Sequence, residues 1–245
     1  MKNTVIIIPT RLNAKRFPNK PLAKIGDIPM IVHVLKRAKE SEVGEVFVAT
    51  PDDEIYQTVK TNGGNAILTK NNHQSGSDRV YEAYSKKLGN KVDLIINLQG
   101  DMPNIRPESI SKLVNHMKSN NCDIGTLASI IKDKREFLDK NIVKVYIDQV
   151  LEKNNFLKAK DFFRINNDLN SDKIYHHIGI YAFTSVALTK YVKLPRSKLE
   201  IERNLEQMRA MENNLIVKVG LSESLPLGVD TKEDLAKVTN EMDEV

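Results

Sequence analysis

Apolar and polar residues alternate along the first hundred positions in blocks that predict strands and helices in turn. Residues 5–8 form a continuous apolar run with three isoleucines, typical of a strand covered on both faces, and Pro9 ends it. Similar short runs follow at residues 45–49, 66–68 and 94–98. Helical spacing fills the stretches between them, at 29–40, 50–62 and 77–87. This alternation predicts an α/β fold with a doubly wound, mainly parallel sheet and right-handed crossovers.

The second half of the chain has a less regular pattern. Residues 132–173 carry only short strand-like pieces, at 142–147 and 150–151, among Asn, Asp and Lys. The other expected elements are a helix at 107–118, strands at 124–131, 177–183 and 215–221, helices at 185–192 and 198–213, and a terminal helix capped by Thr231. No convincing linker interrupts the chain. We therefore predict a single domain over 1–245, in which 132–173 is an irregular region.

A strongly basic loop follows the first apolar run. Arg11, Lys15, Arg16 and Lys20 fall within ten residues of one another, close to the expected carboxyl end of a buried strand. Ligands of open α/β sheets bind outside the carboxyl ends of the strands, and this many positive charges suits a triphosphate better than a single phosphate. The alternative interpretation is an exposed basic loop without a ligand.

Two aspartates are candidate metal ligands. Asp101 follows the apolar run 94–98 and stands beside Gly100, and Asp230 lies in the similar stretch Leu-Gly-Val-Asp-Thr. Mg²⁺ usually takes one or two carboxylates together with phosphate oxygens and water. Asp230 has an equally good alternative interpretation as part of the N-terminal cap of the last helix, so both remain open.

Composition narrows the range of functions. The net charge of +5 fits an anionic substrate, while 6% aromatic residues and no Trp argue against a nucleic-acid partner. The single Cys122 excludes an intramolecular disulfide and any cysteine-rich metal site, which favours a cytoplasmic location. No apolar run approaches the roughly 20 residues of a membrane span, so no membrane partner is expected. P-loop, GxGxxG and Ser/His/Asp patterns are also missing from the sequence.

The motifs together resemble one family, the 3-deoxy-manno-octulosonate (KDO) cytidylyltransferases. The matching stretches are IIIPTRLNAKRFPNKPL, MIVHVL, VAT, HQSGSDR, NLQGDMP, HHIGIYAF, LEQMR and GVDTKEDL, and they run nearly end to end. The resemblance implies a Rossmann-like nucleotidyltransferase fold with a smaller element that serves a homodimer, for which 132–173 is the candidate. It further implies transfer of CMP from CTP to KDO, giving CMP-KDO and pyrophosphate for lipopolysaccharide synthesis.

The resemblance also implies roles for individual residues. Arg11, Arg16 and Lys20 would bind the CTP phosphates, with Ser75, Arg79 and Gln99 near the nucleotide. Asp101 and Asp230 would hold Mg²⁺ and, with Lys20, carry catalysis. The sugar acid would meet Gln99, His177, Tyr181, Glu206 and Gln207. Nothing in the spacing of the last four marks them, because they look like ordinary strand and helix positions.

Two departures from the family pattern keep other substrates open. Met102 stands where an acidic residue is common, and residues 155–164 lack the usual aromatic-Ser-Arg and Ile-Pro pattern, so the basic residue that meets the sugar carboxylate (Lys158, Lys160 or Arg164) is not fixed. The alternatives are a cytidylyltransferase for another acidic sugar, such as 8-amino-KDO, or a sugar-phosphate nucleotidyltransferase. A non-enzymatic basic binding protein would explain the charge but not the two aspartates.

Overall fold

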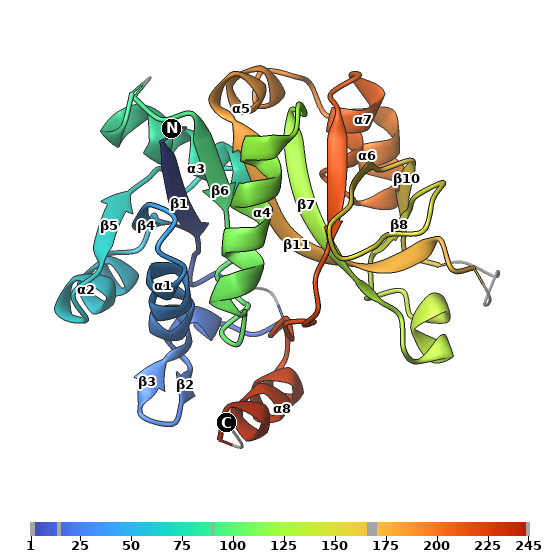
Figure 1. Cartoon of the computed structure of the whole chain (residues 1–245). Coiled ribbons are helices and arrows are strands. Elements are labelled where there is room, and N and C mark those ends of the chain that lie inside the picture. Colours follow the sequence, from blue (N-terminus) through green and yellow to red (C-terminus); the bar gives the residue numbers. More distant parts are fainter. Residues whose placement is uncertain (1–2, 14–15, 90, 166–170, 244–245) are drawn as a thin grey trace. The chain divides into compact units, whose positions relative to one another are not determined.

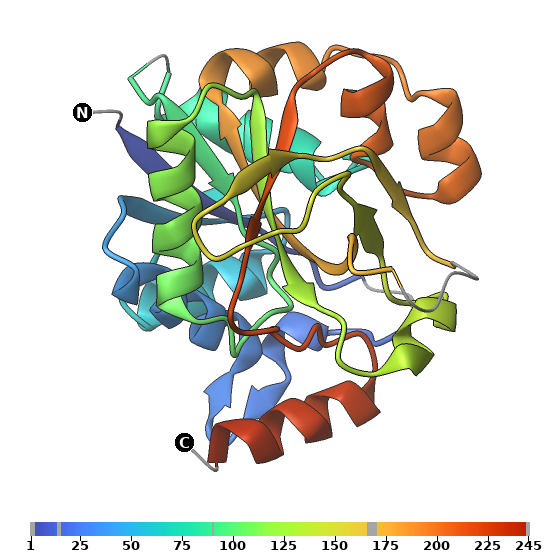
Figure 2. The same cartoon turned by 45° about the vertical axis from the view of Figure 1, so that its right-hand side comes forward.

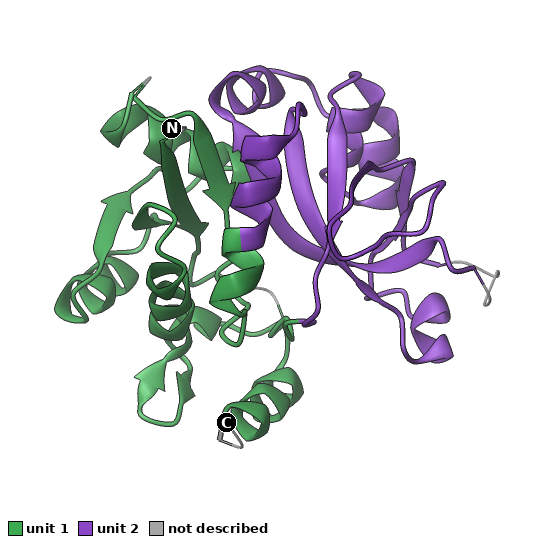
Figure 3. Cartoon of the chain, in the orientation of Figure 1, with its two compact units in different colours: residues 1–111, 226–245 green, residues 112–225 purple. Residues whose placement is uncertain are grey.

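The computed structural model describes residues 3–13, 16–89, 91–165 and 171–243, so Lys15 of the basic loop lies outside the described residues. The chain forms two compact units (Figure 3): residues 1–111 with 226–245, and residues 112–225. The last twenty residues therefore return to the first unit. The single domain over 1–245 stays a prediction, because a compact unit need not fold independently.

Four parallel strands form the sheet of the first unit. They are β1 (Thr4–Pro9), β4 (Glu45–Thr50), β5 (Asn65–Leu68) and β6 (Leu94–Asn97). Their spatial order is β5-β4-β1-β6, and every neighbouring pair is parallel (Figure 1). β4 and β5 extend the sheet on one side of β1 and β6 pairs on its other side. The strand order therefore reverses between β1 and β6, which is where open α/β sheets bind ligands.

The helices of this region confirm the predicted alternation. They are α1 (Met30–Glu40), α2 (Asp53–Thr61), α3 (Gly76–Lys87) and α4 (Pro107–Ser119). Ile6, Ile7 and Ile8 of β1 are fully buried, as the continuous apolar run predicted. The sequence pattern missed a short hairpin of β2 (Lys24–Ile25) and β3 (Ile28–Pro29) before α1. Pro29 ends this hairpin as the N-cap of α1, so its predicted place as the first helical residue is wrong by one position.

A small satellite core joins the basic loop to the end of the chain. The loop continues through the 3-10 turn η1 (Lys20–Leu22), and the terminal helix α8 spans Lys232–Asp243. Phe17, Ile25 and Met30 from the first part of the chain pack in one cluster with Val229 and Val238 from the last part. Burial of apolar side chains, at about 1.5–3 kcal/mol each, stabilises this contact. It brings residues more than 200 positions apart into one unit.

The second unit contains a mostly antiparallel sheet. Its strands are β7 (Ile124–Ile130), β8 (Lys144–Tyr146), β9 (Phe156–Lys158), β10 (Asp161–Phe163), β11 (Ile174–Thr184) and β12 (Val217–Leu221). The order is β11-β7-β12-β9, with β8 paired to β11 and β10 paired to β8; only β12 and β7 are parallel. Figure 2 brings these short strands forward.

The described part of the region 132–173, residues 132–165 and 171–173, has more regular structure than its pattern predicted. Besides β8, β9 and β10 it holds the 3-10 segment η2 (Lys134–Leu138). The strand predicted at 142–147 is shorter than expected, and the piece predicted at 150–151 is not a strand. Strands of three residues are too short to show a period, so the pattern gave no signal for β9 and β10.

Besides residues 112–119 of α4, the described part of the second unit contains the helices α5 (Ser185–Tyr191), α6 (Lys198–Arg203) and α7 (Met208–Glu212). The single helix predicted over 198–213 is therefore wrong. The first helix ends at Asn204, whose φ of 52° is left-handed and typical of a helix C-terminus. None of the helices in the described part of the chain has the length and apolar character needed to cross a bilayer.

A buried ion pair holds α6 and α7 together. The Arg209 guanidinium donates two hydrogen bonds to the Glu200 carboxylate, at 2.8 and 2.6 Å, and both residues are less than 5% exposed. The guanidinium also lies over the Tyr191 ring, 4.9 Å from its centroid. Burial opposes the charge on Glu200, but hydrogen bonds from Arg209 and the Ser197 amide outweigh it and lower the pKa of the carboxyl.

We expect Glu200→Gln to lower the free energy of unfolding by about 3–5 kcal/mol, because it leaves the Arg209 charge buried without its partner. Urea unfolding followed by circular dichroism measures this in a chain without Trp. Glu202→Gln, whose carboxylate is exposed and 3.8 Å from Lys198, is the control and should cost less than about 1 kcal/mol.

The sign of the pH dependence follows from the lowered pKa of Glu200. The stability that its carboxylate contributes is present above the ordinary glutamate pKa and is lost as the pH falls through the lower value in the folded state. The difference between wild type and Glu200→Gln should therefore shrink on acidification. A difference that grows below pH 4 would contradict the assignment.

Candidate functional site

A cavity of about 490 Å³ opens at the carboxyl ends of β1 and β6, where the strand order reverses. Six residues that the sequence singled out line it: Arg11, Lys20, Ser75, Arg79, Gln99 and Asp101. Three other lining residues had no predicted role: Asn13, His73 and Gln74. His73 and Gln74 belong to the HQSGSDR stretch, and this motif was the one feature of the sequence that could have indicated their place in the site. The structure thus gathers most of the predicted nucleotide side in one place.

The basic loop is held in place at both ends. Near its start, the Leu12 amide donates to the Asp52 carboxylate at 2.8 Å. Near its end, Phe17 is buried in the satellite core and Asn19 turns the chain with a φ of 58°. The Lys20 side chain is only 12% exposed. A lysine fixed in this way is pre-organised, in contrast to the mobile lysines of an ordinary basic surface.

Asp101 and Asp230 lie together although 129 residues separate them in the sequence. The Val229 amide donates to the backbone carbonyl of Asp101 at 2.9 Å and joins the two segments. Lys20 Nζ lies 3.1 Å from the Asp101 carboxylate and 3.2 Å from that of Asp230, and it donates to the Val229 carbonyl at 2.6 Å. Both carboxylates therefore face one point, where the Lys20 ammonium lies.

Arg16 adds a second positive charge beside this cluster. Its guanidinium lies 2.7 Å from the Asp230 carboxylate, and 60% of its side chain is exposed. Arg16 and Asp230 do not line the cavity itself and adjoin it through Lys20. Two carboxylates and two cations give the cluster no net charge. Its exposed ion pair contributes little to stability, so the arrangement is better explained by a ligand than by folding energy.

The alternative interpretation of Asp230 as a helix cap is settled by its neighbours. Thr231 Oγ1 accepts from the Asp234 amide at 3.2 Å, and the Asp234 carboxylate accepts from the amides of Thr231 and Asp230 at 3.0 and 3.1 Å. This is the reciprocal pattern of a capping box. Burial disfavours the Asp234 charge, but these hydrogen bonds outweigh it and lower its pKa. The Asp230 carboxylate is left to face Lys20 and Arg16.

The oxygens at this point suit a hard divalent cation. Two carboxylates and the Val229 carbonyl converge on the Lys20 ammonium. Mg²⁺ prefers oxygen ligands and commonly takes only one or two carboxylates from the protein, with water and phosphate completing its shell. Within the described ranges there is no group of three or more His, Cys, Asp and Glu residues suited to a metal. Asp101, Asp230 and the Val229 carbonyl would suit such an ion by the type of their oxygens.

The N-terminus of α3 forms another wall of the cavity. Ser75 caps the helix by accepting from the Asp78 amide at 3.2 Å, and Gly76 follows it. Arg79 is 3% exposed and donates to Thr69 Oγ1 and the Lys70 carbonyl at 2.5 and 2.9 Å. Burial, and then the nearby Arg11, lower the pKa of this guanidinium. Helix N-termini attract anions, so this wall supports a phosphate ligand.

Another part of the cavity lining follows β6. The Gln99 side-chain amide donates to Asn97 Oδ1 at 3.1 Å, which fixes its orientation. A Cβ on Gly100 would lie 3.2 Å from the Pro9 carbonyl oxygen and from Thr10 Cβ, so glycine allows the ends of β1 and β6 to approach closely. Met102 is only 5% exposed and belongs to the core. The departure from the family pattern at this position thus places an apolar side chain away from solvent.

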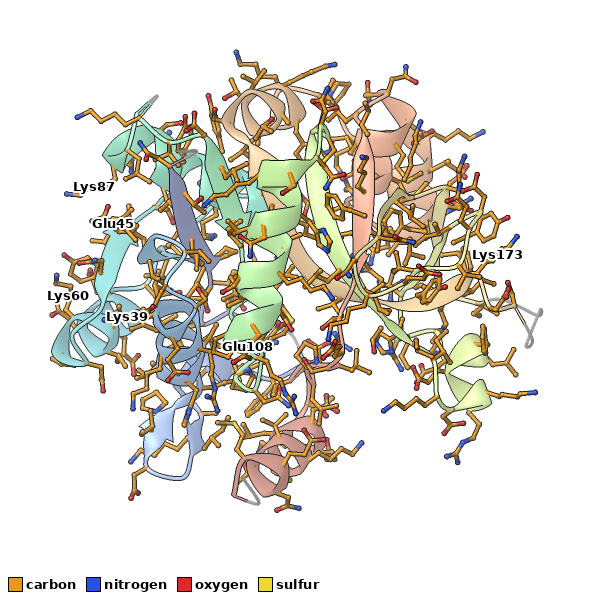
Figure 4. The ribbon with its side chains drawn as sticks, in the orientation of Figure 1. Lys39, Glu45, Lys60, Lys87, Glu108 and Lys173 are labelled. Carbon is orange, nitrogen blue, oxygen red and sulfur yellow. The ribbon has the colours of Figure 1, made fainter. Side chains whose placement is uncertain are left out.

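Most other positive charges lie away from the cavity. Lys60 of α2 and Lys87 of α3 stand at the periphery of the first unit (Figure 4), and neither lines the cavity. Lys39 of α1 donates to the Gly63 carbonyl at 2.7 Å, at a turn beyond α2. The net charge of the chain is therefore a weaker indication of an anionic ligand than the positions of Arg11, Arg16 and Lys20 at or beside the cavity.

The four residues of the proposed sugar side lie in the second unit. His177 is 7% exposed, its Nε2 is 3.0 Å from Thr126 Oγ1, and burial lowers its pKa to about 3. The ladder between β11 and β7 shifts register between Ile178 and Tyr181, so a bulge sets the direction of Tyr181. The His177 and Tyr181 rings lie 5.4 Å apart, and burial, with a smaller effect of Glu206, raises the pKa of Tyr181.

Glu206 and Gln207 lie in the turn between α6 and α7. The Tyr191 hydroxyl donates to the Glu206 carbonyl at 2.7 Å and lies 3.3 Å from its carboxylate. Gln207 is 8% exposed and precedes α7. Both residues are thus held by the turn that interrupts the predicted long helix, and not by a solvated helix face.

The three basic candidates of residues 155–164 have different surroundings. Lys160 pairs with Asp148 at 2.8 Å. Arg164 donates to the backbone carbonyls of Lys140 and Asn141 at 3.1 and 3.4 Å. Lys158, at the end of β9, is exposed. Of these three side chains, Arg164 is the one that backbone carbonyls hold in place.

Known proteins that resemble this chain are cytidylyltransferases. A family model described as cytidylyltransferase matches residues 5–221. The chain is 42% identical to a 3-deoxy-manno-octulosonate cytidylyltransferase of Rhodopseudomonas palustris (strain BisB5), over 95% of this chain and 94% of that protein. The chain belongs to the 3-deoxy-manno-octulosonate cytidylyltransferase family. A relative of the same name from Brucella canis is 41% identical over 95% of the chain and 92% of its own length.

A solved structure supports membership of this cytidylyltransferase family. It is that of CMP:2-keto-3-deoxy-manno-octonic acid synthetase complexed with CTP, with 35% identity, a TM-score of 0.90 and 99% of each chain covered. The predicted α/β nucleotidyltransferase fold and the family resemblance are both confirmed. The roles of the individual site residues stay predictions.

We expect Asp230→Asn to leave the stability of this cytidylyltransferase unchanged within about 0.5 kcal/mol, since its partly exposed side chain does not cap α8. Thr231→Ala should cost about 1 kcal/mol, the usual cost of losing an N-cap. Thermal unfolding of the two variants measures the difference. A larger loss for Asp230→Asn than for Thr231→Ala would restore the capping role to Asp230.

Proposed function

We propose that the protein transfers CMP from CTP to KDO, giving CMP-KDO and pyrophosphate for lipopolysaccharide synthesis. The observation that carries this proposal is the cavity at the β1/β6 switch point, where a fixed lysine, a helix N-terminus and Asp101 meet, with Asp230 beside the same lysine. The curated relatives carry the name of this activity, and the similar solved structure holds CTP. The reaction is proposed to take place in the cytoplasm, where CTP is made.

The chain's own groups act mainly by position and charge. Arg11, Arg16 and Lys20 would neutralise the triphosphate, and the α3 N-terminus beside Ser75 would bind a phosphate oxygen. The anomeric hydroxyl oxygen of the sugar acid forms the new bond to the α-phosphorus. The bond from that phosphorus to the β-phosphate oxygen breaks and pyrophosphate leaves, while the hydroxyl proton is released. Lys20 is placed to stabilise the leaving pyrophosphate.

Mg²⁺ is the proposed cofactor, and Asp101 and Asp230 are the residues that would hold it. When bound, it would polarise phosphate oxygens and offset their charge. The two carboxylates now share Lys20, so they need another cation once Lys20 contacts phosphate. This reasoning supports a divalent-ion requirement without assigning a general base.

For the sugar acid we propose Gln99, His177, Tyr181, Glu206 and Gln207 as binding residues. A second copy of the chain is the proposed partner. Four apolar side chains of the second unit are between 49% and 57% exposed: Ile130, Leu138, Val150 and Ile165. Three of them adjoin the start of β11, since Ile130 pairs with Tyr175, Glu136 of the Leu138 segment bonds His176, and the Leu151 amide donates to Tyr175. Such apolar exposure is typical of an association surface.

The purified protein should release pyrophosphate when given CTP, KDO and Mg²⁺ together, and not when any one is left out. A coupled pyrophosphate assay with CTP, UTP and ATP, each with KDO, 8-amino-KDO or a hexose 1-phosphate, separates the alternatives. Turnover only with CTP and KDO supports the proposal. Preference for the amino sugar or for a sugar phosphate would replace the acceptor, and binding without any turnover would favour the non-enzymatic alternative.

Asp101→Asn and Asp230→Asn should each remove most turnover and leave the fold intact, as should EDTA added to the wild type. Each variant should also bind Mn²⁺ more weakly in the presence of CTP, measured by electron paramagnetic resonance. The double variant should be little worse than either single one, because residues that act as a unit are not additive. Asp27→Asn, an exposed turn residue outside the cavity, is the control. Full activity in EDTA would refute the shared metal site.

A further inference from the structure

The Glu82 side chain lies in the middle of α3, behind the wall of the cavity and not in it. It is 12% exposed, and its carboxylate accepts from the Lys70 amide at 3.0 Å and forms a short contact with His73 Nε2. Lys86 Nζ, one helical turn further on, pairs with its other oxygen at 2.5 Å. Burial alone would raise the pKa of Glu82, but hydrogen bonds from Lys86, His73 and Lys70 outweigh it and lower the pKa to about 2. Glu82 is thus a carboxylate throughout the working pH range.

Two of the three partners of Glu82, Lys70 and His73, belong to one loop, residues 69–75, that joins β5 to α3. Arg79 holds the start of this loop through Thr69 and the Lys70 carbonyl, and Glu82 holds it through Lys70 and His73. Arg79 and Glu82 lie three residues apart, on neighbouring positions of the α3 surface. The rigid helix therefore fixes both the beginning and the middle of the loop.

The far end of the same loop forms the cavity wall. His73, Gln74 and Ser75 line the cavity, whereas Glu82 does not. We propose that Glu82 is a positioning residue for the nucleotide: through His73 and the Lys70 amide it sets where the 73–75 wall stands. This inference rests on the proposed function, because it takes CTP as the ligand of that wall.

The test compares Glu82→Gln and Glu82→Ala with wild type in direct CTP binding by calorimetry and in steady-state kinetics. Loss of hydrogen bonds to a charged group corresponds to about a tenfold or larger weakening, so Glu82→Ala should raise the Kd and KM of CTP by about that factor. Glu82→Gln keeps an acceptor and the side-chain shape, so its effect should be smaller. The KM of the sugar acid should not change in either variant.

Two control variants separate positioning from general stability. Val59→Ala removes buried methyl groups from α2, away from the loop, and should lower the melting temperature without changing the KM of CTP. Glu54→Gln changes an exposed carboxylate on the same helix and should change neither quantity. Because Glu82 acts through His73, the Glu82→Ala and His73→Ala effects on CTP binding should be less than additive.

The results that would contradict the role of Glu82 differ from the result that would contradict the proposed function. Unchanged CTP affinity in Glu82→Ala, or an equal loss in Val59→Ala, would reduce Glu82 to a stabilising residue. Equal rises in the KM of CTP and of the sugar acid would place its effect on the whole site and overturn the inference. Wild-type protein that binds CTP but transfers nothing would refute the proposed function, and the calorimetric comparison would still test Glu82.

Discussion

The hydrogen bond from the Val229 amide to the Asp101 carbonyl is the contact on which the candidate site depends. It joins the segment after β6 to the segment before α8, and each carries one aspartate. Val229 is fully buried beside Phe17, so the same residue also fixes the basic loop. A backbone bond and a few apolar contacts thus bring two carboxylates and Lys20 to one point. The charges alone would not do this, because exposed ion pairs are too weak to order a chain.

The charge balance of this point explains how it suits a polyanion. In the structure Lys20 forms ion pairs with Asp101 and Asp230, and Arg16 forms an ion pair with Asp230. The two positive and two negative charges therefore cancel. A triphosphate would compete with the carboxylates for these two cations. If it succeeds, Asp101 and Asp230 face each other without compensation, which is costly unless a further cation arrives. Nucleotide and divalent cation would therefore favour each other's binding, as linkage between two ligands of one site requires.

The sequence was sufficient for those features that local pattern encodes. The strands of the first unit and their parallel direction follow from the short apolar runs that alternate with helical spacing. The basic loop follows from its dense group of charges. The break after α6 depends on the left-handed backbone of Asn204, and a single Asn inside a continuous helical apolar pattern did not mark the end of a helix. Glu82 gave none either, because its partners Lys70 and His73 precede α3 and meet it only when the loop folds back. The motifs named the family, but only the folded structure separates Asp230 from the cap: Thr231 and Asp234 cap the helix through local hydrogen bonds, and Asp230 faces the sequence-distant Lys20.

The proposed sugar-binding residues of the second unit differ in burial and charge from the residues that line the cavity of the first unit. The cavity of the first unit relies on charges that remain partly exposed, whereas His177 is buried and its pKa is lowered to about 3. Above that pH its imidazole is neutral, so it can offer the sugar acid a hydrogen bond but not a positive charge. Its ring nitrogen is already near Thr126, which lies within 3.1 Å of the carbonyls at the β11 bulge. A positive charge for the proposed sugar carboxylate would therefore have to come from a basic side chain, and among those of residues 155–164 the Arg164 guanidinium is the one that backbone carbonyls hold in place.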